Sequence, residues 1–187
     1  MVESAAHVEH VFAADELFFS TTDSHGRIRR ANSTFMRLSG YPRGALVGRA
    51  HNVVRHADMP AGLFRSIWDA IEEGRAASAY ITNRSSDDGH YRVFATIVPL
   101  RQGYLSVRIK PMDAETRNKV EEVYRRVRAK ERDLEARGAS RHQLGEFGGR
   151  ELATELTALG FSSLHDMTLA TLPREVAALV AEGLSNQ

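Results

Sequence analysis

The segment between residues 78 and 110 constrains the fold most, because it has the pattern of three strands joined by two tight turns. Strand-forming residues occupy 78–84, 90–100 and 104–110, and the turn residues Asp87-Asp88-Gly89 and Gln102-Gly103 separate them. The residue that follows the last run is a proline, which ends the pairing. Turns this short join strands that run in opposite directions. The segment therefore predicts a three-stranded antiparallel meander.

The first part of the chain predicts a hairpin followed by helices. Residues 17–22 and 27–31 flank a polar turn, and Asn32 supplies the side chain that commonly caps a helix N-terminus. Glycines and a proline between 40 and 44 keep the next helices short. A longer helix is expected over 60–73, where apolar side chains recur every three or four residues. These side chains, interpreted as core packing, are Leu63, Phe64, Ile67, Trp68 and Ile71.

This order of elements predicts an α+β fold in which a five-stranded antiparallel sheet carries short helices on one face. The first strands must pair with the last ones to close one sheet. We expect residues 1–15 to form a helical or loose cap, and residues 16–111 to form the domain that contains the sheet. Amphipathic helices follow at 112–137 and in the region 148–187.

The C-terminal part predicts helices that act between molecules. Val120, Val123, Val127 and Leu134 have the spacing of a two-stranded coiled coil, with Lys130 in the remaining position, so we expect a homodimer. Residues 138–149 have the composition of a polar, glycine-bearing hinge. Two more helices are predicted at 151–159 and 172–184, with a proline near the first turn of the second. That second helix is too apolar for a DNA-recognition helix.

Composition excludes several classes of protein. The chain of 187 residues has 25 basic and 24 acidic residues, a formal net charge of +1, and no cysteine. A balanced charge argues against a general nucleic-acid binder. The absence of cysteine excludes disulfides, thiolate zinc sites and iron–sulfur clusters. No apolar run approaches the ~20 residues of a membrane helix, and the N-terminus lacks a basic signal region, so we expect a cytoplasmic protein.

Residues 51–60, with the sequence HNVVRHADMP, carry the densest chemistry in the chain. Arg55, His56 and Asp58 cannot be buried unpaired without a cost of several kcal/mol. They therefore either face a polar ligand or form a solvated turn in which Arg55 pairs with Asp58. An arginine beside a histidine suits a phosphate or an anionic ring edge. Phosphate-binding loops and catalytic triads are absent, so enzymatic activity is not expected.

Four stretches together resemble the PAS sensor domain of bacterial aerotaxis receptors, which bind FAD. They are FFSTTDSHGRIRRANSTFMRLSGY (18–41), HNVVRHADMP (51–60), GHYRVFATIVPL (89–100) and GYLSVRIKP (103–111). The resemblance covers residues 16–111, and its most specific part is the ten-residue match at 51–60. Elsewhere in the covered region Ala77 and Arg92 stand where FAD-binding members have tryptophan.

The resemblance implies a soluble redox or oxygen sensor that binds FAD non-covalently between its sheet and its short helices. It passes the signal through its C-terminal helices to a chemoreceptor or signalling kinase. The cofactor-binding residues that it implies are Asn32, His51, Arg55, His56, Asp58, Asn83, His90 and Tyr91. Asn32 is equally readable as a plain helix cap.

Two other functions remain open at this point. The first is a cofactor-free PAS module for dimerisation or interaction, which the residues Ala77 and Arg92 favour. The second is a haem-based gas sensor, for which His51 or His56 could supply an axial ligand. A metal site at His7 and His10 is not expected, because no third ligand is near them in the sequence.

Overall fold

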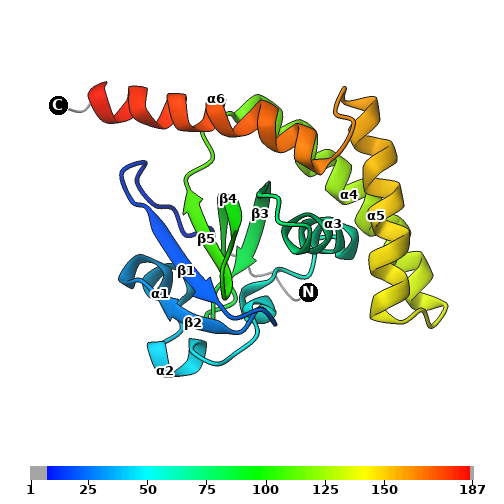
Figure 1. Ribbon diagram of the computed structural model, residues 1–187, viewed down its shortest axis with the longest axis horizontal. Coiled ribbons are helices and arrows are strands. Elements are labelled where there is room, and N and C mark those ends of the chain that lie inside the picture. The colour runs from blue at the N-terminus through cyan, green and yellow to red at the C-terminus, as the bar shows by residue number, and fades with distance from the viewer. Residues whose placement is uncertain (1–7, 186–187) are drawn as a thin grey trace, which may run out of the picture.

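A computed structural model describes residues 8–185 of the chain (Figure 1). Its centre is the predicted meander of β3 (Ala77–Arg84), β4 (His90–Leu100) and β5 (Gly103–Ile109). The hairpin of β1 (Phe18–Thr22) and β2 (Ile28–Ala31) joins it through β1, which pairs with β5. The strand order is β2-β1-β5-β4-β3, and every pairing is antiparallel. The predicted α+β fold class and five-stranded sheet are confirmed.

Short helices follow the hairpin, as the glycines and the proline predict. They are α1 (Ser33–Ser39), α2 (Arg43–Leu46) and the 3-10 helix η1 (His51–Val54). The longer helix α3 (Ala61–Glu72) begins directly after a proline and buries Leu63, Ile67 and Ile71. Asn32 caps α1, because its side-chain oxygen accepts a hydrogen bond from the backbone N–H of Phe35 at 3.2 Å.

The segment before β1 was expected to be a helical or loose cap, and its described part is not helical. Residues 1–7, including His7, lie outside the described part, and residues 8–15 contain no helix. His90 donates its backbone N–H to the Val8 carbonyl, and His10 donates to the His90 carbonyl at 2.7 Å. The His10 ring contacts Asp87 at 3.0 Å. This segment therefore runs extended along the start of β4.

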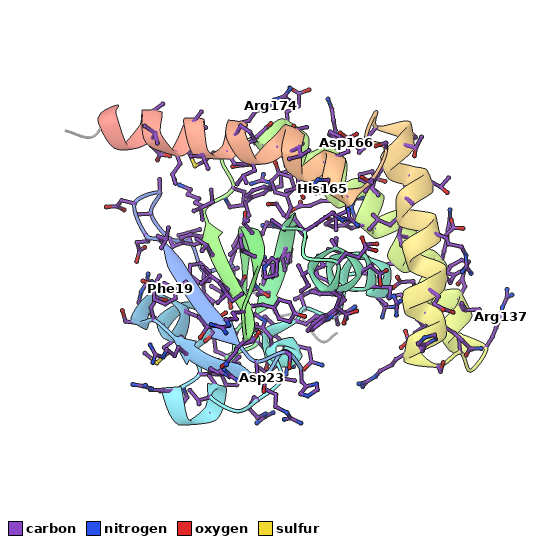
Figure 2. The ribbon with its side chains drawn as sticks, viewed as in Figure 1. Phe19, Asp23, Arg137, His165, Asp166 and Arg174 are labelled. Atoms are coloured by element: carbon purple, nitrogen blue, oxygen red, sulfur yellow. The ribbon has the colours of Figure 1, made fainter. Side chains whose placement is uncertain are left out.

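The C-terminal helices α4 (Ala114–Ala136), α5 (Arg141–Ala158) and α6 (Leu164–Ser185) pack on the same chain. In Figure 1, α4 and α5 form a hairpin beside α3, and α6 crosses back over the sheet. Figure 2 shows Arg137 at the turn between α4 and α5, where it is exposed, and Arg174 on the outward side of α6. None of the described helices is long and apolar enough to cross a membrane.

The coiled-coil expectation for α4 is wrong. Val120, Val123 and Val127 are completely buried within this chain, together with Tyr124 and Glu131. A face that already packs on its own core cannot form a seam with a second copy. The stripe that looks like a heptad is therefore the internal contact of α4.

Two further expectations in this region are corrected. The predicted hinge at 138–149 is mostly helix, because Ser140 and Gln143 form a reciprocal capping box that starts α5 at Arg141. Helix α6 starts at Leu164, so Pro173 lies inside the helix and not near its first turn. The proline side chain is exposed, away from the core.

The C-terminal helices also cover one edge of the sheet, at strand β3. The Thr168 hydroxyl accepts the backbone N–H of Ser78 on edge strand β3 at 2.8 Å. Further along the same edge, Arg55 forms an isolated bridge with Asn83. Covering an edge strand removes its tendency to pair with other chains. The Tyr80 hydroxyl adds a buried bond by donating to Glu175 of α6 at 2.8 Å.

Candidate functional site

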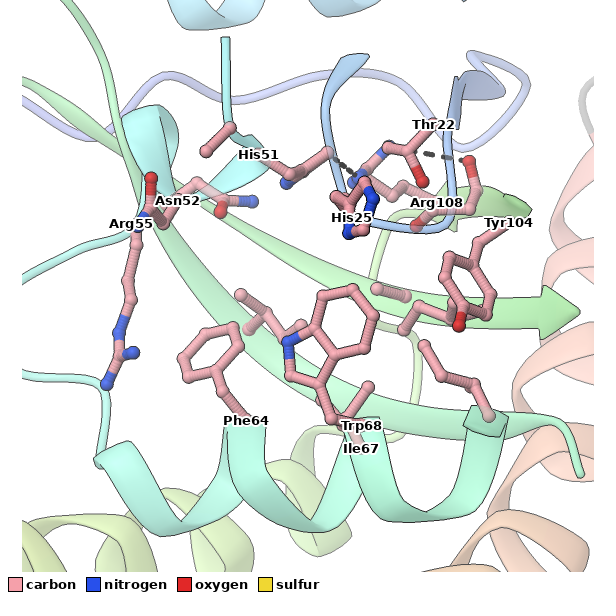
Figure 3. A pocket seen from close by; sticks show the side chains of 18 residues that line it. Thr22, His25, His51, Asn52, Arg55, Phe64, Ile67, Trp68, Tyr104 and Arg108 are labelled. Carbon is pink, nitrogen blue, oxygen red and sulfur yellow. Dashed lines mark hydrogen bonds between the residues drawn. The ribbon is translucent and has the colours of Figure 1, made fainter. Parts of the chain in front are cut away.

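A cavity of about 280 Å³ lies between the sheet and α3. This volume is just under the range of about 300–1,000 Å³ that is typical of small-molecule sites. Its walls come from α3, from β1 and β3 to β5, and from residues 50–55 (Figure 3). The lining side chains belong to two groups, one apolar and one polar, which meet across the cavity.

The apolar wall consists mainly of α3 side chains. Phe64, Ile67, Trp68 and Ile71 line the cavity, and Figure 3 shows Phe64 and Trp68 projecting from α3 toward the strands. The Trp68 ring meets the Tyr104 ring edge to face at 5.3 Å. The interpretation of Phe64, Trp68 and Ile71 as plain core packing was therefore incomplete. Their spacing was read correctly, but the helix face that they form borders a cavity.

The polar end is built around Arg108 of β5, which is only 3 % exposed. One guanidinium nitrogen, Nη2, lies 2.5 Å from the His51 Nε2 atom. The other, Nη1, donates to the Ser20 hydroxyl at 3.1 Å and to the Ser106 carbonyl at 3.4 Å. Burial lowers the pKa of Arg108 to about 10, so the side chain stays charged at neutral pH.

His51 is neutral in this arrangement. Burial and the charge of Arg108 lower its pKa from 6.5 to about 3. A guanidinium has no acceptor atom, so the Nε2 atom of His51 must accept and the proton of the neutral ring is on Nδ1. The ring also stacks on Phe35 at 5.7 Å.

Two polar atoms of the cavity lining have no hydrogen-bond partner among the described residues. They are the amide nitrogen Nδ2 of Asn83 and the hydroxyl of Ser106, and both are buried. A buried donor without a partner costs about 1–3 kcal/mol. Both residues belong to the lining of the cavity.

Three of the predicted site residues line this cavity, namely His51, Arg55 and Asn83. The Arg55 guanidinium lies 4.0 Å from the centre of the Phe64 ring and donates to the Met59 carbonyl at 3.0 Å. Burial lowers its pKa. Arg55 does not pair with Asp58, so the alternative of a self-contained ion pair in this turn is not what the structure shows.

The other five predicted residues do not line the cavity. Asn32 caps α1 and also donates to the Leu17 carbonyl, so its polar atoms are used within the hairpin. Asp58 forms an ion pair with Arg132 of α4. His56 accepts the backbone N–H of Asp58, and its ring contacts that of His90. Tyr91 is completely buried beside Phe18.

Of the two departures from the aerotaxis pattern, Arg92 lies away from the cavity. It pairs with Thr82 in the sheet, whereas the cavity-lining Ile81 and Asn83 belong to the opposite face. Its guanidinium contacts Glu9 at 2.5 Å and Glu121 of α4 at 3.4 Å. Ala77 is buried opposite Ile97, which does line the cavity. Only the departure at Ala77 is therefore on the cavity face.

The haem alternative has no support at this site. The Nε2 atom of His51 is engaged by Arg108 and Ser20, and His56 lies outside the cavity lining. Among the described residues no group of three or more histidines and carboxylates could hold a metal ion.

Sequence reasoning missed Arg108, Ser106 and Trp68 as residues of this site. Arg108 follows Ser106 at a spacing of two on one strand, which places both on one face. That spacing was the available signal that the two side chains share a face of the sheet. Whether this face borders the cavity depended on the pairing of β5 with β1 and β4.

Comparison with known proteins agrees with this fold. Residues 28–106 match the family described as PAS fold. The aerotaxis receptor of Escherichia coli (strain K12) is 39% identical over 108 residues, which are 55% of this chain and 21% of the receptor. Residues 28–106 therefore match a PAS domain, and the wider similarity to the aerotaxis receptor supports the resemblance seen in the sequence. The chain matches about a fifth of the length of this relative.

Two solved structures show a partial likeness to this chain. The blue-light activated histidine kinase of Erythrobacter litoralis EL346 has a TM-score of 0.48 at 18% identity, over 62% of this chain and 40% of that one. A light-oxygen-voltage domain studied with a flavin analogue has a TM-score of 0.48 at 19% identity, over 64% of this chain and 89% of that one.

Proposed function

We propose that this domain binds FAD non-covalently, with the isoalloxazine ring in the cavity, and acts as a redox or oxygen sensor in aerotaxis-type signalling. The observation that carries the proposal is the pair of unsatisfied atoms, Asn83 Nδ2 and Ser106 Oγ, opposite the aromatic wall of α3. Isoalloxazine is a flat aromatic ring with a polar edge of carbonyl and nitrogen atoms. Such a ring matches both walls at once.

The residues have distinct roles in this proposal. Asn83 and Ser106 complete their hydrogen bonds with the polar edge of the ring, and His51 and Arg55 border it. Phe64 and Trp68 pack on its apolar surface. FAD would supply the redox chemistry, because it accepts and returns electrons. Asn32 and Tyr91 serve the fold around the site.

Helix α3 is one element that connects the cavity with the C-terminal helices. One face of α3 lines the cavity, and its N-terminus is held by Glu131 of α4, which accepts the backbone N–H groups of Ala61 and Gly62 at 2.8 Å each. We propose that a change of cofactor state biases the position of α3 and of the C-terminal helices packed on it. A chemoreceptor or signalling kinase would read that change.

The first experiment is the visible absorption spectrum of the purified protein, followed by heat release and chromatography of any chromophore. Flavin bands and released FAD support the proposal. A colourless protein that stays colourless after incubation with FAD contradicts it and favours a cofactor-free interaction module.

Variants of the two unsatisfied residues test the site itself. Asn83→Ala and Ser106→Ala should each weaken FAD binding by about 3–10-fold, because each removes one hydrogen bond of about 0.5–1.5 kcal/mol. Asn118→Ala, at an exposed position of α4, is the matched control and should bind FAD as the unmodified protein does. Equal affinities in all three variants would reject the site assignment.

A further inference from the structure

Arg108 is a buried cation without a counter-charge. Its hydrogen-bond partners are the Ser20 hydroxyl, the Ser106 carbonyl and the neutral ring of His51, none of which is negative. No carboxylate forms an ion pair with it in the described part of the chain. A buried charge normally has an opposite charge beside it, because leaving water is costly.

The surroundings of Arg108 offset only part of that cost. Its guanidinium carbon lies 5.0 Å from the centre of the Phe35 ring and 5.5 Å from that of Phe18. Such contacts contribute about 0.5–2 kcal/mol each. Arg108 also lines the cavity, with Trp68 on the opposite wall (Figure 3), so its uncompensated charge lies at the edge of the cavity.

The other titratable groups that line the cavity do not neutralise this charge. They are His25, His51, Arg55 and Tyr104, and none of them is a carboxylate. Arg55 is a second cation, but it lies over the Phe64 ring and donates to the Met59 carbonyl. The lining therefore contains positive side chains and no negative one. This excess of positive charge favours a ligand that is an anion or that gains a negative charge while bound.

We infer that Arg108 makes the cavity selective for the anionic form of reduced flavin, an inference that rests on the FAD binding proposed above. A reduced electron carrier supplies two electrons, and one proton goes to N5 of the ring. The resulting monoanion carries its negative charge at N1 and the adjacent C2 carbonyl. The positive charge of Arg108 offsets that charge, so N1 does not take up a second proton.

The test is the midpoint potential of the FAD-loaded protein as a function of pH, with free FAD in the same buffers as reference. For a two-electron couple a tenfold change in an equilibrium constant corresponds to about 30 mV. Uptake of one proton therefore gives about 30 mV per pH unit, and uptake of two gives about twice that. The inference expects the smaller slope to persist in the protein at pH values where free FAD shows the larger one. The larger slope in the protein would overturn it without any variant.

Variants then assign the effect to Arg108. Arg108→Met should weaken binding of reduced FAD about tenfold more than binding of oxidised FAD, and so lower the potential by about 30 mV. Arg108→Lys retains the charge and should restore most of the potential. Arg30→Met, at an exposed position of β2, is the matched control. If Arg108→Met does not fold, Arg108→Gln provides the uncharged variant.

The outcomes separate this inference from the proposed function. Failure to bind FAD in either redox state rejects both. Tight binding of FAD with an unchanged potential in Arg108→Met or Arg108→Gln rejects only the role of Arg108. An equal fall of potential in Arg30→Met would show that the effect is general surface charge, and it would also reject that role.

Discussion

Gly62 of α3 and Gly148 of α5 lie with their backbones in direct contact. A Cβ atom on Gly62 would lie 2.0 Å from the carbonyl carbon of Gly148, and one on Gly148 would lie 2.0 Å from the Glu131 Oε1 atom. That same Glu131 oxygen accepts the backbone N–H of Gly62 at 2.8 Å. Helices α3, α4 and α5 therefore meet at one point at which only glycine fits.

Substitution of the two neighbouring glycines of α5 should give opposite results. Gly148→Ala should destabilise the protein by about 1–3 kcal/mol or more, because the added methyl group must displace Glu131 or α3. Gly149→Ala has its nearest atom at 3.8 Å and should be neutral or stabilising by up to about 1 kcal/mol, since alanine favours helix. Urea unfolding of both variants measures the difference. Equal stabilities would show that the helices can separate at no cost.

Removal of the negative charge of Glu131 should loosen the start of α3. Its carboxylate is completely buried and serves two backbone N–H groups at the positive end of the helix. Glu131→Gln leaves at most one acceptor for these two donors, so we expect a loss of about 1–3 kcal/mol. Glu135→Gln on the exposed side of α4 is the control. Amide hydrogen exchange at Ala61 and Gly62 should be faster in Glu131→Gln and unchanged in Glu135→Gln. Identical exchange rates in the two variants would contradict the prediction.

Acid should destabilise the protein through His51. Its pKa falls from 6.5 to about 3 on folding, so between these values the unfolded chain binds the proton more readily. The stabilisation is complete above about pH 6.5 and is lost as the pH falls toward 3, with a slope of up to about 1.4 kcal/mol per pH unit. His51→Gln keeps an acceptor for Arg108 but does not titrate, so its stability should fall less steeply over this window. His142→Gln, at an exposed site, should retain the slope of the unmodified protein, and parallel curves for all three would refute the assignment.

The bond between Tyr80 and Glu175 should contribute to the docking of α6. Burial and then the hydrogen bond to Glu175 raise the pKa of Tyr80, so the phenol remains a donor at neutral pH. Glu175 also accepts the backbone N–H groups of Met112 and Asp113, at the start of α4. Tyr80→Phe should therefore cost about 0.5–2 kcal/mol and increase proteolysis within α6. Unchanged protease sensitivity would indicate that packing alone holds the helix.

The parts of the fold that were predictable are those fixed by local chemistry. The meander follows from turn residues between apolar runs, and the cap at Asn32 follows from its position before a helical pattern. Helix α5 was misjudged because Gly145, Gly148 and Gly149 indicate a hinge by propensity, whereas tertiary contact with α3 favours them in a helix. The apolar stripe on α4 was misjudged because a helix that packs on its own chain and a helix that packs on a second copy show the same spacing of apolar residues.

The site was only partly predictable, because its polar end joins residues that are far apart in the sequence. Arg108 and His51 are separated by 57 positions. Nothing in the sequence YLSVRIK distinguishes a buried arginine from one on a solvated face. The pairing of Asn83 with Arg55 across the edge of β3 likewise required the folded sheet.

The glycine contact between α3 and α5 also has a mechanical meaning. Most helix interfaces can absorb a small shift by rotation of side chains, but at Gly62 and Gly148 no side chain lies between the two backbones. At this point a displacement of α3 toward α5 would meet the α5 backbone directly. In this part of the molecule the domain that holds the cavity and the C-terminal helices touch backbone to backbone.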